Sequence, residues 1–478
     1  MYDIIKILNY LIENGIFIFA IAIFLSYILM AIISGFEMVR YMRKNSFVDY
    51  SPVISSPFAP PVTILAPAYN EGNTIIENIR SLLSIHYSDF EVIIINDGSR
   101  DNSLEKIITH YQLEKVNFLV NELLPAKPIR GVYKSTNKAY SKLIVVDKEN
   151  GGKADALNAG INISNKKYFA SIDVDCILEE DALLKMIKPF LEDNQNRVIA
   201  TGGVIRIANS CNVQDGKIVE INLPVNLIAR FQVLEYTRAF LMGRMAWSRL
   251  NGLLLISGAF GLFDREIVIK AGGYDSKTVG EDMELIVRMR RYMIENDLKY
   301  RIVYIPDPLC WTEVPEKIRV LSRQRDRWTR GTIETLFRHK SLFFNPKYGN
   351  LGLLGHPYWF FFEWMAPIVE FLGIFYFILI IVLGNPDWPF FFVLMGFTYL
   401  FAVTYSAWAV VFEEFTYARY RRKRDVARLI AISFLEPLLF HPLNVWFSVR
   451  GNFHYLIGNI SWGRMEKTGF ADKKKVKK

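Results

Sequence analysis

The sequence predicts a doubly wound α/β domain joined to several membrane-spanning helices. Short β-branched runs alternate with amphipathic stretches from Val62 to about residue 340. This alternation is typical of a parallel sheet covered by helices on both faces. Two further runs, 15–36 and 390–412, contain no charged residue. Each reaches the roughly 20 residues that a helix needs to cross a bilayer.

The composition excludes several classes of protein. Of the 478 residues, 51% are hydrophobic and 22% are charged, and the mean hydropathy is +0.16. Disordered, collagen-like and disulfide-stapled secreted chains are therefore excluded. Cys176, Cys211 and Cys310 form no metal or disulfide pattern, and we expect reduced thiols. The net charge is +9, but the basic clusters 419–424 and 473–478 lie beside apolar spans or at the tail. This placement favours membrane topology and lipid contact over nucleic-acid binding.

The N-terminal part is predicted to be a membrane anchor over residues 1–50. Residues 1–14 carry apolar side chains at helical spacing, which predicts a short interfacial helix. The run 15–36 predicts an uncleaved transmembrane helix. Arg40, Arg43 and Lys44 follow it and place that end in the cytoplasm. Prolines at 52, 57, 60 and 61 then predict a stiff linker.

Residues 60–345 are predicted to form the α/β domain. Its ligand crevice is expected beyond the carboxyl ends of the parallel strands. We expect residues 121–140 to be a polar insertion. The expected strands are 62–66, 91–95, 117–120, 143–147, 168–172 and 198–204, and the expected helices are 73–84, 101–111, 153–163 and 179–193.

The C-terminal part, 355–450, is predicted to return to the membrane. Spans at 363–384 and 390–412 predict a hairpin, and the run 427–449 carries Pro437 and Pro442 in its middle. A broken, re-entrant or interfacial hairpin is the preferred interpretation of that run. Two amphipathic stretches, 225–250 and 332–344, are either core or interfacial helices, and residues 451–478 form a basic cytosolic tail.

Carboxylates follow several of the expected strands. Asp173 and Asp175 lie one residue apart after an apolar strand, a pattern that suits a hard divalent cation bridging phosphate oxygens. A solvated turn is the alternative. Asp97 either accepts hydrogen bonds from a base or ribose or caps the next helix. The run Ala68–Glu71 closes the first strand at the same edge.

Three further motifs have a functional and a structural interpretation. The run 151–155 (GGKAD) opens a helix and predicts either phosphate binding or a plain turn. The run 280–282 (Gly-Glu-Asp) precedes an expected helix over 283–295. Its carboxylates either stabilise the helix dipole or include a general base. The run 324–328 (QRDRW) offers guanidinium groups and an indole, or is an amphipathic helix at lipid headgroups.

In this order, the motifs resemble those of the membrane-integrated family 2 glycosyltransferases, which include cellulose, hyaluronan, chitin and poly-N-acetylglucosamine synthases. The resemblance covers residues 60 to about 345 and the flanking spans, and the run 461–469 also resembles the tail of bacterial relatives. It implies a cytosolic GT-A domain, a Rossmann-like nucleotide-diphospho-sugar transferase fold, with transmembrane and interfacial helices. The implied location is the inner (plasma) membrane, multi-pass, with the catalytic domain cytoplasmic.

The resemblance also implies roles for individual residues. Asp282 stands as the catalytic base, with Gly280 where the family has threonine, and Asp173 and Asp175 would hold Mg²⁺ or Mn²⁺ on the diphosphate. The loop 257–261 lacks the cysteine of some synthases. The implied nucleotide or donor contacts are Ala68, Tyr69, Glu71, Asp97, Lys153, Asp155 and Asp173, the implied acceptor contacts are Phe260, Glu281, Gln324 and Trp328, and Arg327 is implied as a catalytic residue at the diphosphate.

The expected function is an inverting, UDP-sugar-dependent β-glycosyltransferase that polymerises a polysaccharide and passes it through the membrane. The donor would be UDP-glucose or UDP-N-acetylglucosamine. The implied partners are this donor, a growing glycan or lipid acceptor, membrane lipids, and an accessory subunit or second copy that completes a channel, but no nucleic acid. The alternatives are a non-processive enzyme that adds one sugar to a lipid, and a binding protein or transporter with a degenerate transferase domain. Every carboxylate that the chemistry requires is present, which argues against the last.

Overall fold

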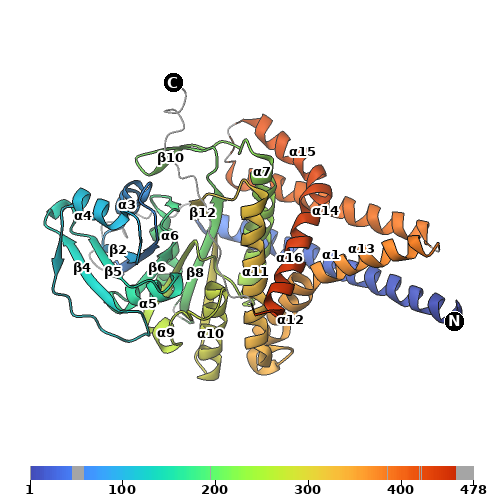
Figure 1. Ribbon diagram of the computed structural model, residues 1–478, viewed down its shortest axis with the longest axis horizontal. Coiled ribbons are helices and arrows are strands. Elements are labelled where there is room, and N and C mark those ends of the chain that lie inside the picture. Colours follow the sequence, from blue (N-terminus) through green and yellow to red (C-terminus); the bar gives the residue numbers. More distant parts are fainter. Residues whose placement is uncertain are drawn as a thin grey trace. The chain divides into compact units, whose positions relative to one another are not determined.

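The computed structural model describes residues 2–45, 59–193, 195–384, 386–418, 420 and 422–458 (Figure 1). The expectations for the prolines at 52 and 57, for the basic residues at 419 and 421, and for the tail 461–478 lie outside these residues. The chain divides into two compact units. Of the described residues, a helical unit comprises those up to Tyr41, Asn226–Gly252 and those from 316 to 458, and a sheet unit comprises those within Met42–Val225 and Leu253–Pro315. The helical unit therefore takes in two stretches of the predicted 60–345 domain.

A mixed sheet of ten strands forms the centre of the sheet unit, in the order β3-β4-β5-β2-β1-β6-β11-β8-β12-β7 among the described residues (Figure 1). The four neighbours β5, β2, β1 and β6 run parallel. Their residues are almost all buried, as expected for strands covered on both faces. The strands are β1 Val62–Ala68, β2 Phe90–Asp97, β3 Leu113–Val116, β4 Ile129–Ser135, β5 Leu143–Lys148, β6 Tyr168–Ile172, β7 Ile177–Leu178, β8 Arg197–Ile207, β11 Phe260–Asp264 and β12 Tyr300–Thr312, with a separate pair of β9 Asn212–Gln214 and β10 Lys217–Glu220.

Two expectations for this sheet are wrong, and five of the six expected strands are confirmed. Residues 117–120 form no strand, because the preceding segment β3 pairs with β4 instead. Leu119 is 95% exposed, so its apolar character does not mark a buried element. The expected insertion at 121–140 contains β4, which pairs antiparallel with β5. Only two of its seven residues are buried, which explains the polar composition.

Helices connect these strands and hold the crevice edge in place. Lys153–Ile163 forms α5 with the expected bounds, and ten of its eleven residues are buried. A Cβ atom on Gly160 would come within 2.9 Å of the Leu65 side chain, so α5 packs closely on β1. The remaining helices of the unit are α3 Ile75–Leu83, α4 Ser103–Tyr111, α6 Ala182–Glu192, α9 Arg265–Lys270 and α10 Glu281–Glu295, with a 3₁₀ turn at Lys138–Tyr140.

The helical unit contains long apolar helices. Among the described residues, three of its helical segments are long and apolar enough to cross a membrane, and a fourth candidate is a pair bent by 45°. The first segment runs without a break from Tyr2, so residues 1–14 do not form a separate interfacial helix. The helices are α1 Tyr2–Asn45, α7 Leu227–Tyr236, α8 Arg244–Arg249, α11 Ile318–Arg338, α12 His356–Tyr358, α13 Ala366–Val382, α14 Trp388–Tyr417, α15 Lys423–Leu439 and α16 His441–Leu456, with 3₁₀ turns at Lys340–Leu342 and Pro346–Tyr348 and π-helical turns at Thr237–Gly243, Leu351–Gly355 and Trp359–Met365.

The predicted break in the last apolar run is confirmed. Helices α15 and α16 meet at Phe440, between Pro437 and Pro442. Proline removes a backbone donor and clashes with the preceding turn, which explains a bend at this place. The expected spans 15–36 and 390–412 lie within α1 and α14, and the expected span 363–384 ends two residues beyond the segment Leu351–Val382. The amphipathic stretch expected at 332–344 is the end of the longer helix α11, which begins at Ile318 and stops at Arg338.

Candidate active site

The carboxyl ends of four parallel strands meet at one edge of the sheet. These strands end at Ala68, Asp97, Lys148 and Ile172. Because β5, β2, β1 and β6 are neighbours and run parallel, the loops that follow them lie at the same edge. The structure therefore places the strand-end motifs at one edge, as the sequence predicts.

The loops after β1 and β2 are tied to each other. The Asn70 amide donates to Ser99 Oγ at 3.0 Å, and the Arg100 amide donates to Asn70 Oδ1 at 2.8 Å. Asn70 has a φ of 57°, a left-handed conformation that asparagine tolerates better than most residues. Beside it, the Tyr69 side chain is 46% exposed and Glu71 is half-buried. Tyr69 thus offers an exposed ring at the strand edge.

Three residues after β6 could hold a metal ion. Asp173, Asp175 and Cys176 each place one donor atom within 4.8 Å of the others. Asp175 is buried and Cys176 is fully buried. The two carboxylates match the oxygen ligands that Mg²⁺ and Mn²⁺ prefer, whereas a thiol is a softer donor. The donor set therefore fits a hard divalent cation on Asp173 and Asp175.

Lys153, the first residue of α5, joins this carboxylate pair to the start of α10. Its Nζ lies 2.5 Å from Asp173 Oδ1 and 4.0 Å from Glu281 Oε1. It also donates to the Gly258 carbonyl at 3.0 Å. Burial lowers the pKa of Lys153, but the charges of Asp173, Glu281 and Asp282 outweigh burial and leave the pKa above its ordinary value. The ammonium group therefore stays charged at neutral pH.

Asp282 lies in the first turn of α10, next to the same lysine. Its Oδ2 accepts a hydrogen bond from the Gly258 amide at 3.0 Å, and its Oδ1 accepts one from the Met283 amide at 2.9 Å. Gly258 thus contacts Asp282 through its N–H and Lys153 through its carbonyl. A Cβ atom at Gly258 would lie 2.9 Å from Lys153 Nζ and 3.2 Å from Asp282 Oδ2. Only a residue without a side chain leaves these two groups undisturbed.

The loop before β11 contributes backbone atoms to the site. The Asp173 amide donates to the Ala259 carbonyl at 3.3 Å, which ties this loop to the predicted metal pair. The Phe260 side chain is fully buried in β11. The acceptor contact expected of Phe260 would therefore have to involve the loop rather than its ring. Glu281 is also buried, with 4% of its surface exposed.

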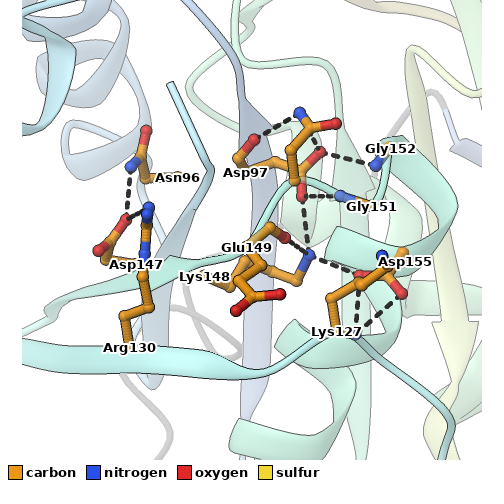
Figure 2. Close-up of polar contacts among 11 residues, drawn as sticks. Asn96, Asp97, Lys127, Arg130, Asp147, Lys148, Glu149, Gly151, Gly152 and Asp155 are labelled. Carbon is orange, nitrogen blue, oxygen red and sulfur yellow. Dashed lines mark hydrogen bonds and ion pairs between the residues drawn. The ribbon is translucent and has the colours of Figure 1, made fainter. Parts of the chain in front are cut away.

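The glycine turn before α5 has an internal anion in place of a phosphate. The Gly151 amide donates to Asp97 Oδ1 at 2.9 Å, and the Gly152 amide donates to Asp97 Oδ2 at 2.7 Å (Figure 2). In this conformation the Asp97 carboxylate accepts both amides, which favours the plain-turn alternative, and phosphate binding stays a prediction. Asp155, the other carboxylate of the motif, accepts the Lys127 amide at 3.0 and 3.1 Å.

The Gln-x-x-Arg-Trp residues lie on α11, in the helical unit. Gln324 and Arg327 are half-buried, and Trp328 is 40% exposed. Between them, the Arg325 guanidinium lies 4.3 Å from the Trp328 ring centroid and makes two hydrogen bonds to the Glu235 carboxylate, at 2.6 and 2.7 Å. The roles expected of Gln324, Arg327 and Trp328 stay predictions.

Two residues of the site have no signal in the motifs. Lys148 is fully buried at the end of β5 and contacts both Asp97 and Asp155. Burial raises the pKa of Tyr274, and the charge of Lys153 only partly opposes this shift. Each is a single residue in an ordinary context, and only the fold brings it to the site.

Comparison with known proteins identifies the family of the chain. The model of the family described as "Glycosyltransferase like family 2" matches residues 60–331. A poly-beta-1,6-N-acetyl-D-glucosamine synthase of Staphylococcus aureus (strain MSSA476) is 30% identical over 278 residues, which are 58% of this chain and 56% of that protein. The synthase of Staphylococcus epidermidis is 28% identical over 277 residues, with the same two coverages. The match thus spans about half the length of these curated relatives.

A solved structure shows the same fold. It is a mannosyltransferase from Pyrobaculum calidifontis in complex with GDP-mannose and Mn²⁺, with a TM-score of 0.53 and 16% identity over 93% of this chain and 99% of that one. At this identity the likeness concerns the fold alone, which is the mixed α/β GT-A sheet with a large helical part. With more than half of the sequence matched by the family model, the chain belongs to glycosyltransferase family 2.

Proposed function

We propose that this glycosyltransferase takes a UDP-sugar as donor and transfers the sugar with inversion to a growing β-linked polysaccharide. One observation carries the proposal: Lys153 connects the carboxylate pair suited to a metal with Asp282, a carboxylate held by the Gly258 amide. A donor diphosphate needs the first group, and an attacking hydroxyl needs the second.

The donor is proposed to be UDP-N-acetylglucosamine, with UDP-glucose as the alternative. The curated relatives are named as synthases of poly-beta-1,6-N-acetyl-D-glucosamine, which supports the first choice. Tyr69 offers an exposed ring for the nucleoside, and Ala68, Glu71 and Asp97 lie in the same loops or strand ends. Lys153 and Asp155 are proposed to complete the donor pocket from α5.

Asp282 is proposed to act as the general base. It takes the proton of the acceptor hydroxyl as that oxygen bonds to the anomeric carbon, and the bond from this carbon to the phosphate oxygen breaks with its electrons leaving on UDP. Inversion of an α-linked donor gives a β-linked product without an enzyme nucleophile. The ammonium group of Lys153 offsets part of the negative charge of Asp282 and of the neighbouring Glu281. A divalent cation held by Asp173 and Asp175 would supply neutralisation of the diphosphate charge.

The enzyme is proposed to be a multi-pass membrane protein with its sheet unit in the cytoplasm and a glycan path among its helices. Three apolar segments, and the bent pair, support the membrane location. Arg43 and Lys44 lie in the last turn of the first helix, and these positive charges favour a cytoplasmic location for that end of the helix. Polar pairs lie among the apolar helices: Glu370 with His441 at 2.7 Å, and Arg238 with Glu436 at 3.0 Å. Such pairs inside a membrane support a hydrophilic path. With few spans, a second copy or an accessory subunit could complete that path.

The experiment is a donor panel. Purified full-length protein in lipid is incubated with several UDP-sugars, one at a time, and with Mn²⁺ or Mg²⁺, and UDP release and product length are measured. We expect UDP release with one donor and products of many sugars. Absence of UDP release with every donor would refute the enzyme assignment. Products that are one sugar long would instead support the alternative, a non-processive transferase acting on a lipid.

A further inference from the structure

Lys148 is a fully buried cation that the predicted donor site does not use. It ends β5, and its ammonium group has three partners (Figure 2). Its Nζ lies 2.7 Å from Asp97 Oδ1 and 2.5 Å from Asp155 Oδ1, and it donates to the Glu149 carbonyl at 2.5 Å. An ammonium group has three donors, so these contacts use all of them. A buried charge is tolerated only when it is paired in this way.

The two carboxylates on Lys148 in turn hold the backbone. Asp97 accepts the amides of Gly151 and Gly152, and Asn150 Nδ2 lies 3.2 Å from Asp97 Oδ2. An ionised carboxylate has about four lone-pair sites, and Asp97 has four donors with Lys148 included. All four sites are therefore filled by this chain. Asp97 in this conformation holds the turn before α5.

The turn itself is built around these carboxylates. A Cβ atom on Gly151 would lie 2.4 Å from Asp155 Cγ, so only glycine fits against that carboxylate. Gly152 has a φ of +88° and open space around it, so its conformation alone requires glycine. The next residue is Lys153, which contacts Asp173. Lys148 is thus linked to the predicted donor site through two hydrogen bonds. The first joins its ammonium group to Asp97, and the second joins Asp97 to the amide of Gly152, which precedes Lys153.

We propose that Lys148 is a positioning residue for the donor site, which holds Asp97 and Asp155 and thereby fixes the turn 150–152 and the start of α5. This inference rests on the proposed UDP-sugar site for its functional consequence. Without the Lys148 charge, Asp97 and Asp155 face each other as two buried anions and separate, and the turn loses its acceptor.

The first test measures the turn without any nucleotide. Hydrogen exchange of the peptide containing Gly151 and Gly152 is followed in the full-length protein in detergent. Lys148→Met keeps the side-chain length and removes the charge. We expect exchange in this variant to be at least about tenfold faster, because a hydrogen bond to a charged group is lost. Arg130→Met is the matched control, because Arg130 pairs with Asp147 at 2.6 Å in the neighbouring cluster of Figure 2 and does not contact the turn. Its exchange should match the wild type.

A second-site change separates charge balance from mere packing. Asp155→Asn in the Lys148→Met background removes the second anion and supplies an amide that can donate to Asp97. We expect this double variant to exchange more slowly than Lys148→Met alone. Unchanged exchange in Lys148→Met, or faster exchange in the double variant than in the single one, overturns the proposal. If Lys148→Met does not fold, the double variant is compared with the wild type, and it must then fold with a protected turn.

The third measurement connects the turn to the donor site. UDP binding in the presence of Mn²⁺ is measured by calorimetry, and we expect the dissociation constant to rise about tenfold in Lys148→Met and to stay unchanged in Arg130→Met. A loosened turn with unchanged UDP affinity overturns the positioning role. If the wild type itself binds no UDP, the proposed function fails, while the exchange experiment still decides whether Lys148 fixes the turn.

Discussion

Gly258→Ala is expected to slow sugar transfer while leaving the protein folded. The added methyl group would lie 2.9 Å from Lys153 Nζ and 3.2 Å from Asp282 Oδ2. Ordinary contacts between such atoms begin near 3.4 Å, so the lysine must withdraw by about half an ångström and the carboxylate by less. Gly258 is not one of the described glycines with a positive φ, so alanine causes no backbone strain at this position. The perturbation therefore falls on two side chains of the site.

The expected loss of activity follows from this displacement. A misplacement of about 1 Å at a reacting centre can cost about a hundredfold in rate, so a shift of half that size should cost about 10- to 100-fold in kcat. UDP release is the assay. Thermal unfolding checks the fold, and the free energy of unfolding should change by less than about 1 kcal/mol. The control is Gly396→Ala in α14, where a Cβ atom meets nothing within 4 Å. Activity of Gly258→Ala within twofold of the wild type would refute the placement of Asp282 and Lys153 at the reacting centre.

Three further predictions address the metal pair, the helical unit and the pH response. Asp175→Asn should weaken Mn²⁺ binding, followed by electron paramagnetic resonance, by at least about tenfold without loss of thermal stability, and unchanged binding would remove this residue from the metal site. Asp326→Asn should cost about 2–3 kcal/mol in unfolding experiments, because the buried carboxylate accepts hydrogen bonds from Arg330 and Arg450 at 2.9 and 3.3 Å, and a change below about 0.5 kcal/mol would contradict this. Hydrogen bonds from Lys270 and Arg197 lower the pKa of Glu266 from 4.5 to about 2. Because the folded pKa is the lower one, the stabilisation is present above about pH 4.5 and is lost as the pH falls through about 2. The wild type should therefore be more stable than Glu266→Gln by under about 1 kcal/mol at this half-exposed site. Acid unfolding should show this difference shrinking between these two pH values.

The parallel centre of the sheet could be predicted from the sequence because burial on both faces makes its strands apolar throughout. The run 168–172 and the helix 153–163 have the predicted bounds. At the edge of the sheet this reasoning fails. The strand β4 is half exposed and therefore polar, and the exposed Leu119 lies in an apolar run that forms no strand. Apolar patterning reports burial, and it identifies strands only where the two coincide.

The site was predictable where a strand end alone places a residue, and unpredictable where partners come from distant segments. Asp173 and Asp175 follow β6 directly, so the strand and its motif together predict their place at the strand end. Lys148 ends an apolar strand with no motif, and its partner Asp97 lies 51 residues earlier. The glycine turn left two interpretations open for the same reason: its amides need an acceptor, and only the fold shows that Asp97 of this chain accepts them in this conformation. Local sequence identifies the donors of a hydrogen bond more readily than their partners.

The most direct test of the central claim is Asp282→Asn, assayed with the donor that the panel selects. The amide keeps an oxygen that can accept the Gly258 hydrogen bond, so UDP affinity in the presence of Mn²⁺ should stay within about twofold of the wild type. A general base contributes about 10²- to 10⁴-fold, and we predict a fall in UDP release of that size. Release within about twofold of the wild type, with UDP still bound, would contradict an inverting transfer that uses Asp282 as its base.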